Sequence, residues 1–560
     1  MFKKTDPNPL LDIFTAPSMQ LGNRASKKYS DPNAWHNQFY SLVTTKIDEE
    51  TSKPLFPEGK KSGHPNASIR ILVAMSVLKE GFGCSDEDLF EKCEFDLLTR
   101  KALGMELLTD VTPSIDIYYL FRRRICEYQE RTGIDLMRHC FEQITGNQVR
   151  LLKISGKCVR MDSKLIGSNI ARQSRYELIH TTLVKFLKTC TLSDLSPEQE
   201  ERAKEYLKED SSKTVYRSDS DTLQSNLARI GNFIMEMLAA FPVASPAHDL
   251  LLRLFDEQYV VKDGKAVLRD KKEVKADSLQ NPNDPDATYR AKNDQKVQGY
   301  VTNITETVEE GKPSIITSVQ VETVVFADCH FLQEAVENSE RVTNSTIEDL
   351  YADGAYQSPD NQEVAKNHNA MQLKTGKMQG GSRWELIPHD EDGLTIREIA
   401  TGNTYEAVKA VTKQGSRKRW RIPWNNKTGW RYFEDKDIKA YQLRKQIESL
   451  PLEEQHKRNN VEAAMSQYSF HTRNGKTRYR GLLKHRMHAY SRCMWMNLRR
   501  IVIFQISTFQ RSKFAFFGPI REAFGSFKAI SRKIFTSGAD CYVSLRMTTL
   551  VRLNSKYAPF

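Results

Sequence analysis

Three acidic residues stand where a carboxylate could do chemistry. Asp162 lies in the run Lys157–Ile166, whose alternating apolar and polar residues predict a half-buried strand. Asp353 ends a second strand-like run and precedes a glycine, at the kind of position where α/β sheets put their ligands. Glu462 lies on a predicted later helix. If folding brought the three together, their hard oxygen atoms could hold two Mg²⁺ ions, with Mn²⁺ as a substitute, for an in-line displacement at phosphorus.

Each of these acids, taken alone, also fits an ordinary structural role. Asp162 could be a capping or surface residue, Asp353 a turn residue, and Glu462 one of many exposed helical acids. The three are far apart along the chain, so their spacing does not decide between the two interpretations. Only a fold that brings them together would make them a site.

The predicted elements around the acids have an order that could do this. The strand with Asp162 is followed by a predicted hairpin, Val297–Thr307 and Ser314–Val325, then by the helix Phe331–Ser339 and the strand ending at Asp353. A strand, hairpin, helix and strand around two aspartates, with a glutamate on a later helix, indicate a mixed α/β fold with a ribonuclease-H-like catalytic core.

The overall charge points to an acidic partner. The 560 residues carry a formal net charge of +12 and a pI of about 9.0, which suits a polyanion because Lys and Arg neutralise phosphates. A basic protein without a nucleic-acid role has the same composition. The nine cysteines include no Cys-x-x-Cys pair, and no apolar run is long enough to span a membrane, so we expect a reducing, cytoplasmic setting.

Two basic stretches are candidate DNA contacts. Arg122, Arg123 and Arg124 lie on the predicted helix Ile115–Glu130, in a module of short helices that could place one helix in a DNA groove. A helical packing domain with a solvated basic face is the alternative. The second stretch could track phosphates and stack on unpaired bases, or could be an edge strand with its aromatic residues packed beneath. It comprises Arg417, Lys418, Arg419, Trp420 and Arg421.

These patterns divide the chain into six expected segments. They are an N-terminal arm (1–60), a helical DNA-binding domain (61–150), a first part of the catalytic core (151–365) with a helical insertion at about 172–280, a β-rich insertion (366–450), a second part of the core (451–510) and a basic tail (511–560).

Five stretches resemble the DDE insertion-sequence transposases, in the branch with a β-rich insertion between the second aspartate and the glutamate. They are Leu55–Arg100, Arg160–Ile170, Asp284–Tyr300, Asp349–Tyr356, and Arg458–Glu462 with Arg478–Leu482. The resemblance implies a ribonuclease-H-like core, dependence on two Mg²⁺ ions, binding of double-stranded terminal inverted repeats and target DNA, and strand transfer. It places Asp162, Asp353 and Glu462 on the metal-binding acids and Arg458 on the helix arginine. It also implies a homodimer that pairs two DNA ends, in the bacterial cytoplasm at the nucleoid.

The sequence departs from that pattern at two helix positions. Relatives of this type often have a Tyr and a Lys where this chain has Gln455 and Ser469. We expect phosphate contacts to come instead from a basic segment just beyond the helix. Its candidates are Arg473, Lys476, Arg478 and Arg480. Two alternatives remain open, which are an inactive DNA-binding remnant and a nuclease of the same fold that does not join strands.

Overall fold

The computed structural model describes residues 2–4, 14–56, 66–292, 295–368, 371–375, 382–389, 393–411, 418–424, 429–449 and 451–534. The chain divides into two compact units, Met1–Val502 and Ile503–Phe560. No helix among the described residues is long and apolar enough to cross a membrane.

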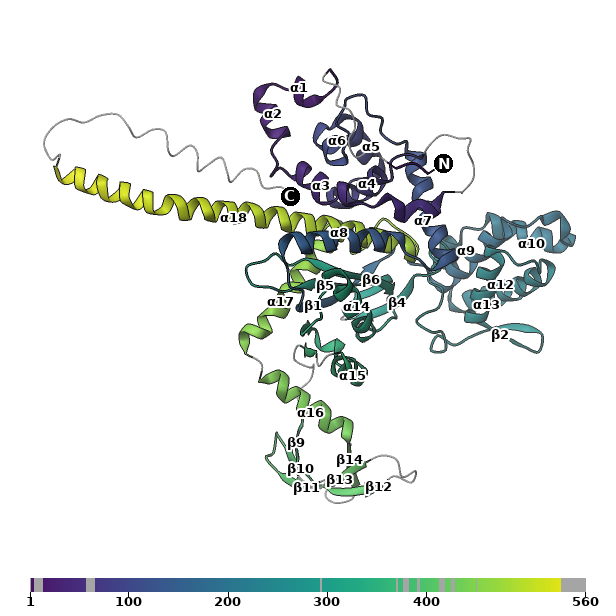
Figure 1. The fold of residues 1–560 in the computed structure, drawn as a ribbon. Coiled ribbons are helices and arrows are strands. Elements are labelled where there is room, and N and C mark those ends of the chain that lie inside the picture. The colour runs from purple at the N-terminus through teal and green to yellow at the C-terminus, as the bar shows by residue number, and fades with distance from the viewer. Residues whose placement is uncertain are drawn as a thin grey trace. The chain divides into compact units, whose positions relative to one another are not determined.

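Short helices form the first 150 residues (Figure 1). They are α1 (Pro17–Gln20), α2 (Asn23–Tyr29), α3 (Trp35–Leu42), η1 (Thr44–Lys46), η2 (Glu49–Leu55), α4 (Ile69–Phe82), α5 (Asp86–Phe95), α6 (Leu97–Leu103), α7 (Ile115–Thr132) and α8 (Leu136–Leu152). Ser85 caps α5 through a capping box, as its sequence predicts, but α5 ends at Phe95 because Asp96 caps a new helix.

The segment expected to be an N-terminal arm packs into the helical module instead. Phe39 and Val43 are fully buried in the same hydrophobic core as Ile69 and Leu72. The sequence indicated an arm with a short helix around Trp35–Val43, and α3 (Trp35–Leu42) lies there, but the few periodic apolar positions did not show that it packs into the module. The packing boundary therefore does not fall at residue 60.

A six-stranded mixed sheet forms the centre of the α/β part. Its strands are β1 (Cys158–Gly167), β4 (Thr288–Lys292), β5 (Gln295–Thr307), β6 (Ile316–Thr323), β7 (Asp349–Ala352) and β8 (Gln372–Thr375). β1 pairs antiparallel with β5, and β5 pairs antiparallel with β6. On its other side β1 pairs parallel with β7, which pairs parallel with β8. Helix α14 (Leu332–Thr343) packs on β6, and η4 (Asp328–Phe331), η5 (Gly354–Tyr356) and α15 (Pro359–Asn367) complete this region.

A helical insertion follows β1 and has its own core. It comprises α9 (Arg175–Leu187), η3 (Leu192–Asp194), α10 (Pro197–Lys208), α11 (Ser211–Arg217), α12 (Ser220–Ala240), α13 (Pro246–Gln258) and the hairpin β2 (Tyr259–Lys262) and β3 (Lys265–Leu268). Its two ends meet beside the sheet, because Asn281 Nδ2 donates to Ala171 O at 3.1 Å and Ser168 Oγ donates to the buried Asp284 carboxylate. Asp284 also accepts from Tyr300 Oη at 2.6 Å.

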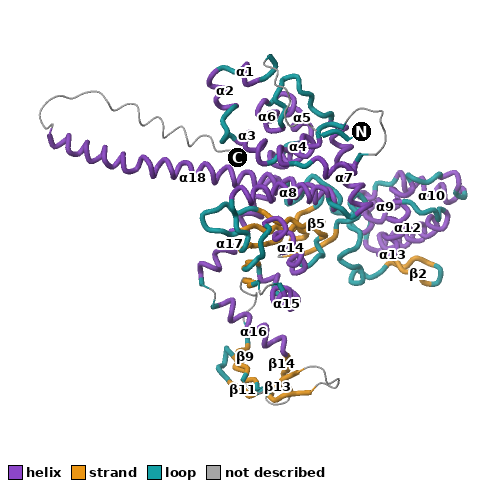
Figure 2. Tube along the Cα trace, in the orientation of Figure 1, coloured by secondary structure: helices purple, strands orange, loops and turns teal. Residues whose placement is uncertain are grey.

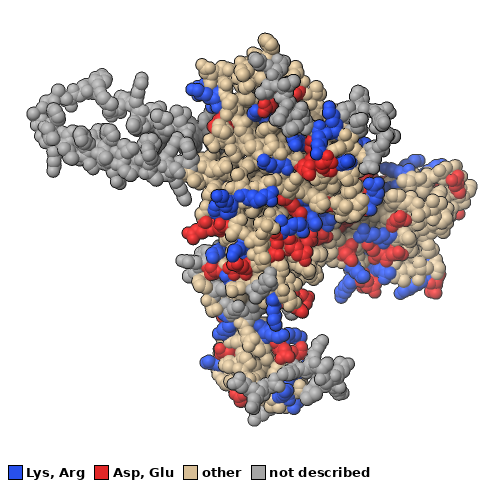
Figure 3. All heavy atoms as spheres, viewed as in Figure 1, with Lys and Arg blue, Asp and Glu red and all other residues tan. Residues whose placement is uncertain are grey.

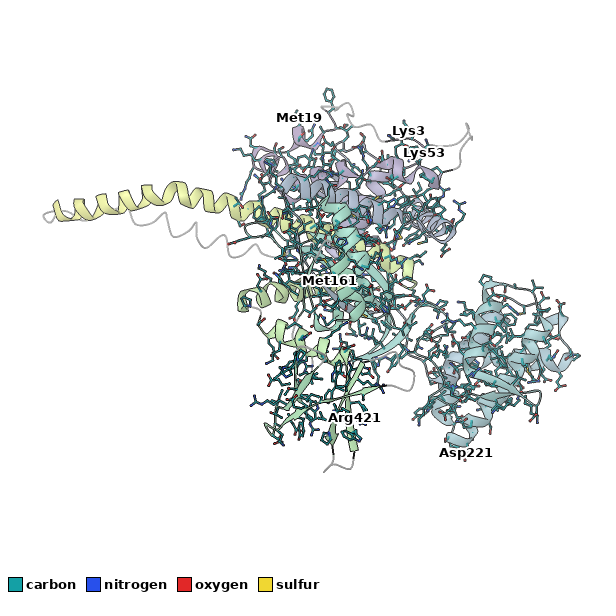
Figure 4. All side chains as sticks on the ribbon, turned by 60° about the horizontal axis from the view of Figure 1, so that its bottom comes forward. Lys3, Met19, Lys53, Met161, Asp221 and Arg421 are labelled. Atoms are coloured by element: carbon teal, nitrogen blue, oxygen red, sulfur yellow. The ribbon has the colours of Figure 1, made fainter. Side chains whose placement is uncertain are left out.

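The β-rich insertion forms two small antiparallel sheets. One contains β9 (Trp384–Pro388), β10 (Leu394–Glu398) and β11 (Thr404–Glu406), and the other contains β12 (Val408–Val411), β13 (Lys418–Trp424) and β14 (Gly429–Glu434). They share an apolar core with α16 (Asp435–Glu448). In Figure 2 the strands of this insertion, of the six-stranded sheet and of the β2–β3 hairpin are drawn in orange. Figure 4 labels Met161 in β1, Asp221 in α12 and Arg421 in β13.

Two helices complete the described chain. α17 (Leu452–Tyr468) packs on β1, and after η7 (Ser469–His471) the chain enters α18 (Leu482–Ile534). The sequence predicted a helix over Lys484–Val502, and the observed helix continues well beyond it. Most of the predicted basic tail, from residue 535 onward, lies outside the described residues.

Candidate active site and nucleic-acid interface

The strand register places Asp162 and Asp353 side by side. β1 and β7 are parallel, with Cys158 opposite Asp349 and Arg160 opposite Tyr351. Extended by two residues, this register would set Asp162 opposite Asp353, although β7 itself ends at Ala352. The charges of both acids act on the buried phenol of Tyr356. The two acids come from chain segments far apart in the sequence, and the sheet makes them neighbours.

Both acids are oriented by the backbone that follows them. Asp162 Oδ1 accepts from the Ser163 amide at 2.8 Å. Asp353 Oδ1 accepts from the Gly354 amide at 2.7 Å and so caps η5. The turn that the sequence indicated after Asp353 is therefore present. Its first amide, that of Gly354, orients the carboxylate just after β7.

Helix α17 covers the face of β1 to which Asp162 belongs. Side chains alternate between the two faces of a strand, so Arg160, Asp162 and Lys164 share one face. Arg160 Nη1 donates to Lys457 O at 3.0 Å, and Lys164 Nζ donates to Ser469 Oγ at 2.7 Å. Because both neighbours of Asp162 on this face contact α17, Asp162 faces the same helix between the two contacts.

Glu462 lies on α17 between these contact points, but its side chain is exposed. Its neighbours Val461 and Ala464 are buried against the sheet. Among the described residues, no three His, Cys, Asp or Glu side chains form a group that could hold a metal ion. The structure thus brings Asp162 and Asp353 together and carries Glu462 on the covering helix, without gathering all three carboxylates.

A buried charge network supports this arrangement. Glu306 of β5 is fully buried, and its carboxylate accepts from Arg160 Nε at 2.6 Å and from Arg500 Nη1 at 2.7 Å. Arg160 is therefore bound to the sheet and, through Lys457 O, to α17. The network ties the helix that carries Glu462 to the strand that carries Asp162.

Tyr356 is a buried neighbour of both aspartates that the sequence interpretation did not single out. Burial and the negative charges of Asp162 and Asp353 contribute to raising the pKa of its phenol well above the usual value. Its hydroxyl donates to Asn303 Oδ1 at 2.7 Å, and Asn303 lies opposite Ser163 in the β1–β5 pair. The only sequence signal was its position three residues after Asp353.

A large groove brings together predicted DNA contacts from two distant segments. Its volume is about 1640 Å³, and it lies between α7, the α4–α5 turn and the segment 471–484. Five of the predicted contacts line it, namely Arg122, Arg123, Arg473, Lys476 and Arg478. Lys79, Tyr479 and Lys484 also line it and had not been singled out in the sequence.

The other predicted contacts lie elsewhere. The Arg124 guanidinium stands over the Phe56 ring at 5.6 Å, and Arg480 Nε donates to Asn169 O at 2.7 Å. Arg417 and the side chains of Lys418 and Arg458 lie outside the described residues. Figure 3 shows acidic and basic side chains interspersed over the visible face, so the positive net charge does not form a patch of one sign there.

On the β-rich insertion, the aromatic residue expected to stack on bases faces the core. Trp420 is buried, because strand alternation places it with Phe433 inside the shared apolar core. Arg419 pairs with Glu434 at 2.7 Å, and the Arg421 guanidinium lies 4.2 Å from the ring centre of the half-exposed Trp430. Of Trp420 and Trp430, the latter is the one exposed to solvent.

A cation also stands beside Ser469, one of the two positions where the sequence departs from the pattern that it resembles. It is Lys164, whose amine is held by the Ser469 hydroxyl and lies 3.5 Å from Met465 O. Burial lowers the pKa of Lys164, and the charge of Asp162 opposes this effect. The positive charge at this end of α17 comes from β1 instead of from the helix.

Comparison with known proteins gives one match. Residues 28–124 match a family model described as "Transposase domain (DUF772)". No curated protein and no solved structure matches the chain. The match runs from the end of α2 into α7 and crosses residue 60, in agreement with the shared core of this region. It includes Arg122, Arg123 and the α4–α5 side of the groove, so one side of the groove lies within the segment that matches this model.

Proposed function

We propose that the chain is a DDE-type transposase with a ribonuclease-H-like core, in which Asp162, Asp353 and Glu462 act on DNA. The observation that carries this proposal is the parallel register of β1 and β7, which would set Asp162 opposite Asp353 if it is extended by two residues. The sheet supports it, because β1 has two antiparallel strands on one side and two parallel strands on the other. The transposase domain at residues 28–124 supports it independently.

A carboxylate in the middle of β1 and one just after β7 offer the hard oxygen ligands that Mg²⁺ requires. Asp162 and Asp353 would hold the ion, with Glu462 added by a rotation of its exposed side chain on α17. When bound there, Mg²⁺ stabilises the charge that develops at phosphorus during phosphodiester cleavage. The chain itself supplies the orientation, through the Ser163 and Gly354 amides, and a cation on the same strand face, Lys164.

The proposed substrates are double-stranded terminal inverted repeats and target DNA. The freed 3′-hydroxyl end would be joined to the target, and pairing of two ends implies a homodimer. The net charge of +12 and the cations of the groove favour such a polyanionic substrate.

Substitution of the acids tests this proposal. Asp162→Asn, Asp353→Asn and Glu462→Gln should each abolish Mg²⁺-dependent nicking of DNA that carries the flanking repeats. DNA binding in EDTA should remain, because these acids contribute no attraction to phosphate. Asp360→Asn, which changes an exposed acid of α15, serves as the matched control and should nick normally.

The outcomes also separate the alternatives. Full nicking by Asp162→Asn would contradict the assignment of the site. Binding without nicking by the unmodified chain would indicate an inactive remnant. Nicking without joining of pre-cut ends would indicate a nuclease with the same fold.

A further inference from the structure

The wall of the groove formed by residues 471–484 is a rigid basic turn attached to the end of β1. Arg473 and Lys476 form a two-residue hairpin, with mutual backbone hydrogen bonds of 3.0 Å. Its central residues, Asn474 and Gly475, have φ values of 52° and 70°, which are typical of a type I′ turn. Gly167 at the end of β1 donates to Gly475 O at 2.8 Å and accepts from the Thr477 amide at 3.0 Å.

This wall carries positive charge without acids of its own. No Asp or Glu occurs between residues 463 and 521. Within the described part of the chain, Arg473 and Lys484 form no ion pair with a carboxylate, and both are exposed. Their charges are thus available to an anion in the groove.

Arg122 contributes a third cation from the opposite wall. Its guanidinium carbon lies 5.4 Å from the ring centre of Tyr118 and 5.2 Å from that of Tyr479. Contact with two aromatic rings positions the guanidinium, and no ion pair joins it to a carboxylate among the described residues, although the charges of Glu80 and Asp86 help to raise its pKa. A planar cation held in this way suits a phosphate.

Five acids line the opposite wall, and three of them have local partners, while Asp116 and Glu130 are exposed. Asp86 pairs with Lys79 and accepts from Tyr119 Oη at 3.0 Å, and Asp88 caps α5. Glu127 pairs with Arg123 at 3.5 Å. These local contacts reduce the repulsion that three of the acids would exert on an anion. Seven Lys and Arg side chains line the groove against five acids, so the lining as a whole is positive.

We propose that this groove holds the sugar–phosphate backbone of duplex DNA, with Arg122, Arg473 and Lys484 as phosphate contacts. The proposal rests on the transposase function proposed above. It adds which surface binds the DNA and how far the contacted phosphates lie from the cut. A volume of about 1640 Å³ exceeds the roughly 300–1,000 Å³ of small-molecule pockets, so the groove suits a segment of polymer.

The attachment to β1 also sets a distance from the acids. Gly167 follows Asp162 by five residues of continuous strand, which span about 17 Å at about 3.3 Å per residue. Along duplex DNA, with about 3.4 Å per phosphate on each strand, this distance corresponds to about five base pairs. With the duplex taken to run along β1, the phosphates at the turn would lie about five base pairs from the bond that is cut.

The salt dependence of binding tests the groove. The full-length protein is titrated with a random-sequence 30-base-pair duplex in EDTA, at about 50 to 200 mM salt. Each lost phosphate contact lowers the slope of log affinity against log salt by about 0.9. For Arg473→Ala combined with Lys484→Ala the slope should fall by about 1.8, so the affinity lost over this salt range should shrink by about 12-fold. Arg217→Ala, an exposed arginine of α11 without an ion pair among the described residues, should leave the slope unchanged.

A second measurement tests the spacing. Neutral methylphosphonates are placed singly along element-end DNA, and the cut site is mapped with the unmodified protein. A neutral linkage about five base pairs from the cut should weaken binding by the unmodified protein but not by the double variant. An unchanged salt slope in the double variant, or a sensitive position elsewhere, would overturn the proposal.

The test of the groove and the test of the catalytic acids can fail separately. Asp162→Asn should keep the full salt slope, because the acid lies outside the groove. If Asp162→Asn cleaved normally while the double variant lost its slope, the groove would stand and the catalytic proposal would fail. The reverse pattern would remove only the groove.

Discussion

Removal of the Glu306 charge is the most demanding test of how α17 is held on the sheet. The side chain of Glu306 is 0% exposed, and those of Arg160 and Arg500 are 7% and 15% exposed. Glu306→Gln keeps the size of the side chain but leaves two buried guanidinium groups without their counter-charge. Breaking a buried pair by removing one partner costs about 3–5 kcal/mol. We expect this cost to appear where the network lies, in β1, β5 and α17.

Hydrogen exchange of the backbone amides measures this loss locally. A cost of about 3–5 kcal/mol corresponds to an increase in exchange of about 150- to 5,000-fold, at about 1.36 kcal/mol per factor of ten. The matched control is Glu322→Gln, which breaks the pair with Arg486 at 2.5 Å. Those side chains are 32% and 25% exposed, so water compensates and the cost should stay below about 1 kcal/mol.

A rescue variant separates charge from packing. In the Glu306→Gln background, Arg160→Met removes one unpaired cation, and it should restore part of the protection in β5 if the cost is electrostatic. Equal exchange in Glu306→Gln and Glu322→Gln would refute the role given to the network. Increased exchange confined to α18, with α17 unchanged, would refute its link to the helix that carries Glu462.

Three further predictions concern pH and packing. Burial raises the pKa of Glu80, but the charge of His488 and hydrogen bonds from His488 and Tyr479 lower it to about 2. The ionised carboxylate therefore stabilises the fold above the ordinary pKa of 4.5, and this stabilisation is lost as the pH falls toward 2. The urea midpoint of Glu80→Gln should change less over this pH range than that of the unmodified protein. Burial, and after it the charge of His488, lowers the pKa of His485 from 6.5 to about 3. Between these pH values the unfolded chain binds a proton at this residue and the folded chain does not, so the free energy of unfolding should fall as the pH drops from 6.5 to 3. A His485→Phe variant with the same fall would contradict this account. Gly299→Ala should destabilise the protein by about 1–3 kcal/mol or more, since a Cβ there would stand 2.4 Å from Ile166 O in the paired strand, and an unchanged melting temperature would show that the two strands are less tightly packed.

The sequence predicted the bounds of the strands around the site better than it predicted which strands pair with one another. β1, β5, β6 and β7 were located to within about two residues, because alternating or apolar runs bounded by turn residues mark strands clearly. The neighbour relation of Asp162 and Asp353 could not be predicted from those patterns. It depends on a parallel register between segments separated by a whole helical insertion, which periodicity does not encode.

The groove was equally hidden in the sequence. Arg122 and Arg473 were both identified as basic candidates, but nothing in the sequence indicated that they line one surface. Which side of β13 faces solvent was left open by the sequence, because a one-residue change of face decides whether Trp420 or its neighbours meet solvent. In each case the missing information was tertiary packing.

The way the helical insertion begins and ends has a consequence for how such chains can change over generations. Since Ala171 and Asn281 meet at a single point of the sheet, the hundred or so residues between them are a graft whose removal or replacement need not alter the strand register. A lineage could exchange this module for another while inheriting the same carboxylate pair.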